Sequence, residues 1–103
     1  MAATVTFTES YDLASGERFC RGTITLGDVY LTDGVVADLS AKLSGTPTVV
    51  IGQQNDTYTL SHDGGTAAAG KMQAVVIANG AEVANAFNTY NVTCSFIAVG
   101  TAV

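Results

Sequence analysis

Apolar and polar residues alternate along several short stretches of this chain, and this pattern constrains the fold more than any other feature. In TVTFT, residues 4–8, Val5 and Phe7 share one parity and the threonines share the other. Successive side chains of a β-strand point to opposite faces of a sheet, so the pattern predicts a strand with one buried face. The same reasoning predicts strands or short extended pieces at residues 18–26, 29–31, 47–53, 57–62, 71–78 and 90–99.

One segment has a helical period instead. Four apolar residues near positions i, i+1, i+4 and i+8 form one stripe, namely Val35, Val36, Leu39 and Leu43. Gly45 follows as a stop signal. The sequence therefore predicts one short helix at about residues 34–43. Within 18–26 the parity of the apolar residues changes around Gly22, which predicts a β-bulge there.

The stretch YNVTCSFIAV, residues 90–99, carries no charge, and no Asp, Glu, Lys or Arg follows Glu82. One parity is apolar throughout, at Tyr90, Val92, Cys94, Phe96 and Ala98, while the other changes from polar residues to Ile97 and Val99. This predicts a strand that begins half-exposed and ends buried on both faces. An uncharged edge strand invites aggregation, so we expect this strand to be central in its sheet or covered by another subunit.

Together these elements predict one all-β domain over residues 1–103, with residues 1–3 as a flexible N-terminal arm. About seven or eight short strands separated by Gly, Asn and Asp turns are typical of an antiparallel β-sandwich or jelly-roll. The two cysteines, Cys20 and Cys94, are interpreted as small buried residues, with a disulfide as the alternative.

The chain has few charges. Charged residues make up 13% of the chain, against about 25% in an average protein. Such a surface indicates either an exposed Thr/Ser-rich sheet or a protein covered by partners. The net charge is −5 and the cations are Arg18, Arg21, Lys42 and Lys71, which disfavours binding to nucleic acid or an anionic membrane. The start has no signal-peptide pattern, and no apolar run is long enough to span a membrane, so we expect synthesis in a cytoplasm.

Candidate chemical groups have simpler interpretations. His62 and Asp63 resemble a base with its orienting carboxylate, but neighbours on a strand point to opposite faces. Asp28, Asp33 and Asp38 are spaced too widely for a calcium loop and suit turns and caps.

Several other short sequence patterns do not indicate a modification or binding site. The glycosylation patterns at Asn55 and Asn91 are expected to be plain turn or strand residues. Gly64-Gly65 forms no phosphate-binding motif. Four tyrosines suit the edge of a core better than a sugar-stacking face: Tyr11, Tyr30, Tyr58 and Tyr90. The sequence therefore predicts no enzyme activity and no catalytic, cofactor or metal residues.

Four stretches, in collinear order, resemble small tailed-bacteriophage capsid proteins of the decoration, or cement, type. Residues 16–40, GERFCRGTITLGDVYLTDGVVADLS, are similar to a strand ending near TITF and a Y-x-T-G-G-E-x-L-x-x-x-D-L connection in that family. Residues 80–86, GAEVANA, are similar to its G-x-E-V-A-N-A segment, and residues 97–100 match its small, apolar ending. Residues 70–74, GKMQA, resemble one limb of its hairpin, although the Ala/Gly/Pro-rich insertion that often follows is absent.

The resemblance implies a non-enzymatic subunit, trimeric, on the exterior of a virion capsid, where it binds the major capsid protein and stabilises the shell. It implies no cofactor and identifies no capsid-binding residue. Two other classes remain open: a glycan-binding or host-adhesion β-sandwich, and a tail or neck component of a virion.

Overall fold

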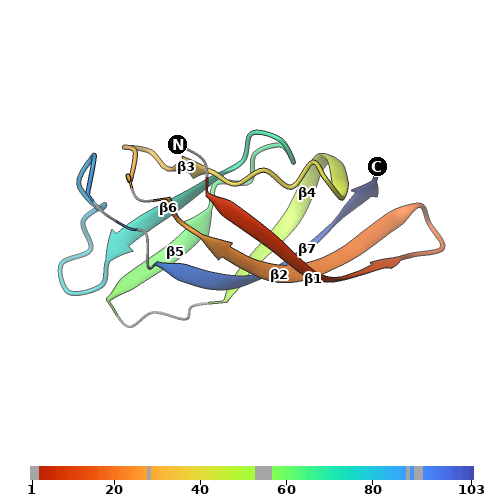
Figure 1. Ribbon diagram of the computed structural model, residues 1–103, viewed down its shortest axis with the longest axis horizontal. Coiled ribbons are helices and arrows are strands. Elements are labelled where there is room, and N and C mark those ends of the chain that lie inside the picture. The colour runs from red at the N-terminus through yellow and green to blue at the C-terminus, as the bar shows by residue number, and fades with distance from the viewer. Residues whose placement is uncertain (1–2, 28, 53–56, 88, 90–91) are drawn as a thin grey trace.

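The computed structural model describes residues 3–27, 29–52, 57–87, 89 and 92–103. Within these residues the regular elements are all β-strands (Figure 1). Their bounds are Thr4–Asp12 (β1), Glu17–Thr25 (β2), Val35–Val36 (β3), Leu43–Gly52 (β4), Tyr58–His62 (β5), Lys71–Val76 (β6) and Thr93–Ala102 (β7). The prediction of an all-β chain with about seven strands is confirmed.

The strands form two antiparallel sheets. One has four strands in the order β1-β2-β7-β4, and the other has three in the order β3-β6-β5. The β1–β2 hairpin extends beyond the three-stranded sheet to one end of an elongated molecule, whose extents are 43 × 22 × 19 Å (Figure 1). β7 lies between β2 and β4, as expected for an uncharged strand that must not lie at an edge.

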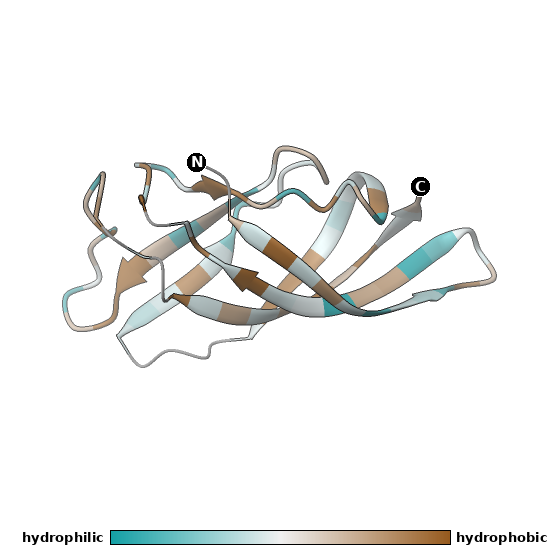
Figure 2. Ribbon diagram, viewed as in Figure 1, coloured by the Kyte–Doolittle hydropathy of each residue, from teal (hydrophilic) through white to brown (hydrophobic). Residues whose placement is uncertain are grey.

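Buried side chains from both sheets form one core cluster. The four-stranded sheet contributes Cys20, Ile24, Cys94, Phe96 and Ala98, and the three-stranded sheet contributes Val35, Leu60, Met72 and Ala74. The sheets meet along two sides. β4 contacts β5, and on the opposite side the Ala3 N–H donates to the Val36 carbonyl at 2.8 Å. The alternation seen in the sequence is therefore the division between this core and solvent, visible along β1 and β2 in Figure 2.

The predicted helix at residues 34–43 is wrong. Val35 and Val36 form β3, which pairs with Met72 and Lys71 of β6. Extended backbone is favoured there because both residues are β-branched and because β6 offers an open edge for pairing. The helical spacing still buries Leu39 and Leu43, but through a single turn in which the Leu43 N–H donates to the Leu39 carbonyl at 3.0 Å.

Two details of the predicted strands also differ. The bulge lies in β1, between Phe7 and Glu9, and β2 pairs with β7 without a shift at Gly22. A Cβ on Gly22 would lie 1.8 Å from the Thr6 carbonyl oxygen, so glycine permits the close approach of β1 rather than a bulge in β2. The end of β7 is not buried on both faces, because Ile97 is 42% exposed.

Cys20 and Cys94 are buried free thiols, in agreement with the favoured interpretation. Burial raises the pKa of both thiols, and that of Cys94 reaches about 11. Thiols held in the protonated form behave as small apolar groups and are poor nucleophiles.

Candidate functional site

Two segments that are far apart in the sequence form one surface, which we call the loop pair and define as residues 29–34 and 82–87. The Tyr30 N–H donates to the Phe87 carbonyl at 2.9 Å, and the Ala86 N–H donates to the Tyr30 carbonyl at 2.7 Å. The Thr32 N–H donates to Asn85 Oδ1 at 3.1 Å. The segments contain the sequences YLTDG (30–34) and EVANA (82–86), which belong to the stretches that resemble decoration proteins.

Glu82 joins the loop pair to the core through Tyr30. The Tyr30 hydroxyl donates to Glu82 Oε2 at 2.6 Å and accepts a hydrogen bond from the Ala74 N–H of β6 at 3.1 Å. The Asp33 N–H donates to the same carboxylate oxygen at 2.8 Å. Burial and then the hydrogen bond to Glu82 raise the pKa of Tyr30 to about 12. The phenol therefore stays neutral and holds both segments in place.

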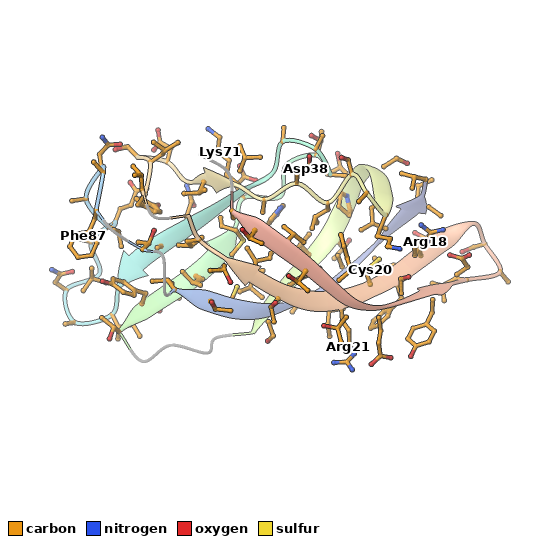
Figure 3. The ribbon with its side chains drawn as sticks, viewed as in Figure 1. Arg18, Cys20, Arg21, Asp38, Lys71 and Phe87 are labelled. Carbon is orange, nitrogen blue, oxygen red and sulfur yellow. The ribbon has the colours of Figure 1, made fainter. Side chains whose placement is uncertain are left out.

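Apolar side chains project from the loop pair into solvent. Val29 and Leu31 flank the buried Tyr30 and are themselves exposed, and Phe87 is 50% exposed. Phe87 lies at the end of the molecule opposite the β1–β2 turn (Figure 3). Ala86, just before it, has a φ of 66°, an unfavourable value for a residue with a Cβ. The backbone is thus strained at Ala86, next to the exposed Phe87.

A second surface is the side of the four-stranded sheet that faces away from the core, which we call the outer face. Arg21 and Cys20 lie on opposite sides of β2, with Arg21 on the outer face (Figure 3). The Arg21 guanidinium pairs with the Glu9 carboxylate on the neighbouring strand, and the Tyr11 hydroxyl donates to the same carboxylate. The hydrogen bonds from Tyr11 and Arg21 hold the pKa of Glu9 below its ordinary value.

The outer face is hollowed beside Arg21. The hollow has a volume of about 260 Å³ and is lined by Val50, Gly52, Ser95 and Ile97 as well as Arg21. It arises because Gly52 has no side chain and its partner Ser95 has a short one. The arrangement offers an apolar recess with one guanidinium at its rim.

His62 and Asp63 organise a turn. The Gly64 N–H donates to His62 Nδ1 at 3.0 Å, and Asp63 Oδ1 accepts from the N–H groups of Gly65 and Lys71 at 2.8 and 3.0 Å. Burial lowers the pKa of His62 despite the nearby Asp63. These bonds explain the residues as supports for the loop before β6.

Other residues considered from sequence do not form a cluster with them. Asp38 accepts a hydrogen bond from the Ser40 N–H, and the Asp33 backbone belongs to the loop pair, while Asp28 lies outside the described residues. The part of the chain that the structure describes contains no group of three or more His, Cys, Asp or Glu residues placed to hold a metal ion.

The remaining candidates are also dispersed. Asn55, Tyr90 and Asn91 lie outside the described residues. Tyr11 is on the outer face and Tyr30 is in the core, while Tyr58 begins β5. Gly64 has a φ of 79° in the turn after β5.

Sequence reasoning missed the two surfaces themselves. In the sequence Glu82 is the last charged residue and part of the GAEVANA segment, but nothing in the sequence pairs it with Tyr30. In the sequence Glu9 shares the parity of Val5 and Phe7, the predicted inner residues, and only the bulge between Phe7 and Glu9 turns its side chain to Arg21 on the outer face. The sequence therefore carries no signal for this pair.

Comparison with known proteins found no protein similar to this chain. No protein-family model, no curated protein and no solved structure matches the chain. Among the described residues there is no helix of the length and apolarity needed to cross a membrane.

Proposed function

We propose that this protein is a non-enzymatic virion structural protein, a decoration or cement protein that binds the outer surface of a phage capsid and stabilises it. The observation that carries the proposal is the loop pair. Two of the sequence segments that resemble such proteins are joined through Tyr30, Glu82 and Asn85 into a single exposed surface. The two-sheet fold is compatible with the β-sandwich or jelly-roll that the resemblance implies.

The proposal assigns the capsid contact to the exposed apolar side chains of the loop pair, Val29, Leu31 and Phe87. They project from a rigid base, because the two segments of the loop pair are hydrogen-bonded to each other at Tyr30 and, through the Tyr30 hydroxyl, to β6. A prearranged surface loses little conformational entropy on binding. A homotrimer, as the resemblance implies, would engage several capsid subunits at once and multiply a modest contact through effective concentration.

The test uses expanded capsids of the phage that encodes the chain, purified without this protein. We expect the wild-type protein to co-sediment with the capsids and to raise the temperature at which they release DNA. Phe87→Asp should bind at least about tenfold more weakly, since a buried unpaired carboxylate is costly. Ile77→Asp is the matched control, because Ile77 is also exposed but lies outside the loop pair. Absence of binding by the wild-type protein would refute the function, and equal losses in both variants would refute the assigned contact.

A second candidate is a glycan-binding or host-adhesion module. The exposed Tyr11 ring beside the Glu9–Arg21 pair favours it, because sugars are bound by an aromatic face together with charged hydrogen-bonding groups. A glycan array separates the two functions: a hit that is lost in Tyr11→Ala would support adhesion. Labelling of whole particles for electron microscopy distinguishes the capsid from the tail or neck.

A further inference from the structure

The outer face presents apolar side chains that nothing in the described structure covers. Val50 is 58% exposed and Ile97 is 42% exposed, and the two are directly paired across β4 and β7. Tyr11 is 55% exposed and packs at 6.3 Å, ring centroid to ring centroid, on Phe19. These neighbours form a band across all four strands, and contiguous apolar patches of this kind mark interaction surfaces.

The centre of this band is electrically neutral although the chain is acidic. The net charge of the chain is −5, yet the centre of the band contains one anion and one cation, Glu9 and Arg21, which are already paired with each other. Glu17 has the outward parity of Phe19 and Arg21 but lies at the end of β2, at the margin of the face. Other acidic groups lie off the band: Asp33 and Glu82 in the loop pair, and Asp63 in the turn after β5. Two copies of an acidic chain repel each other least where such a neutral surface lies between them.

The area of the outer face is consistent with a weak homodimer. β1 and β2 are nine residues long, and β4 and β7 are ten. At about 3.3 Å per residue and about 4.8 Å between strands, the face measures about 30 by 19 Å, or roughly 570 Å². Two such faces bury roughly 1,100 Å², close to the lower limit of about 1,200 Å² for specific interfaces and far below obligate dimers.

We propose that the outer face binds a second copy of this chain, sheet against sheet. Val50, Ile97 and Phe19 lie at the contact, together with Val99, which pairs with Phe19 across β2 and β7. The Glu9–Arg21 pair is buried there as a neutral unit. Burying a pair that is already formed avoids leaving a charge without a partner. The proposal does not depend on the capsid function, and it competes with the threefold state that the resemblance implies, since a symmetric contact of one face with itself joins two copies.

Two physical consequences follow from this contact. We expect a dissociation constant above about 1 µM. Interfaces that bury about 1,600 Å² have dissociation constants of up to about 1 µM, and the contact proposed here buries less area. Added salt should strengthen it, because the attraction is apolar while the two net charges repel and are screened. A contact held by charge pairs would respond to salt in the opposite direction.

Sedimentation velocity over a concentration series tests the proposal on the purified full chain. We expect a reversible monomer–dimer equilibrium that is weakened about tenfold or more in Val50→Glu. Phe87→Glu is the matched control: it has the same final side chain and a similarly exposed site, but lies on the loop pair, and it should dimerise like the wild type. The melting temperature of each variant establishes that it is folded.

A measurement on the wild type removes any dependence on the variants. On dilution, the methyl resonances of Val50, Ile97 and Val99 should shift, whereas those of Ile77 and Val103 should not. A chain that stays monomeric at all concentrations would overturn the proposal. So would a dimer or trimer that Val50→Glu leaves intact, or dilution shifts confined to the loop pair.

Discussion

The two faces of the four-stranded sheet are built from alternate residues of the same strands. The inner face consists of buried apolar side chains, whereas the outer face carries exposed ones. On β7 the inner residues Cys94, Phe96 and Ala98 are buried, while Ile97, between two of them, is exposed. On β2, Ile24 is buried, whereas Arg21 contacts a carboxylate at the surface. The inner face therefore determines whether the sheet folds, and the outer face is free to determine what the folded sheet contacts.

The largest expected effect tests this division directly. Phe96→Ala should lower the free energy of unfolding by about 3–5 kcal/mol, because it removes a fully buried ring that also packs edge-on against Phe7 at 5.9 Å between ring centroids. Ile97→Ala, one residue along the strand, should cost under about 1 kcal/mol. Urea denaturation of both variants measures the two changes in the free energy of unfolding. Similar losses of stability would show that the inner and outer faces contribute equally to folding.

Gly22→Ala should be the next most damaging change. The new Cβ would lie 1.8 Å from the Thr6 carbonyl oxygen, so β1 must move away from β2. Such overpacking costs about 1–3 kcal/mol and sometimes more. Thr23→Ala is the control on the outer parity, for which a much smaller loss is expected. An unchanged denaturation midpoint for Gly22→Ala would contradict the close approach of β1.

Tyr30→Phe tests whether the loop pair is part of the inner structure. Removal of the hydroxyl leaves the Ala74 N–H of β6 without its partner and the Glu82 carboxylate with one donor fewer. We expect a loss of about 1–3 kcal/mol. Hydrogen exchange should also become faster at Ala74. Normal protection there would indicate that the loop pair is held independently of the core.

The smallest effect concerns pH. The folded-state pKa of His62 is lowered, so the unfolded chain binds more protons between that value and about 6.5. Stability from His62 is thus present above about pH 6.5 and is lost as the pH falls below it. Glu9 on the outer face also has a lowered pKa, and its contribution is lost only below the ordinary carboxylate value of about 4.3. Denaturation of His62→Gln from pH 8 down to about pH 3 should lack the first decline and keep the second, which begins only below about pH 4.3.

The alternation of apolar residues predicted most of the strands because it reports directly which side chains meet the core. It failed at residues 34–43, where the spacing of Val35, Val36 and Leu39 fitted a helix while the open edge of β6 imposed a strand. Tertiary pairing of this kind is absent from local sequence. For the same reason the contact of Glu82 with Tyr30 could not be predicted, because it joins residues 52 positions apart. The pair of Glu9 with Arg21 could not be predicted either, because it depends on the bulge in β1 that turns Glu9 to the outer face.

The place of β7 between β2 and β4 also governs when the sheet can form. On a ribosome, the segments of β2 and β4 emerge long before residues 93–102. β2 and β4 do not pair with each other, because both pair with β7. Until β7 is released, the sheet is limited to the β1–β2 hairpin, and an isolated hairpin is only marginally stable in water. Pairing across such long sequence separations is slow. In the nascent chain β4, which carries no charged residue, therefore stays without its partner strand until β7 is available. The four-stranded sheet is thus expected to form only after residues 93–102 have left the ribosome.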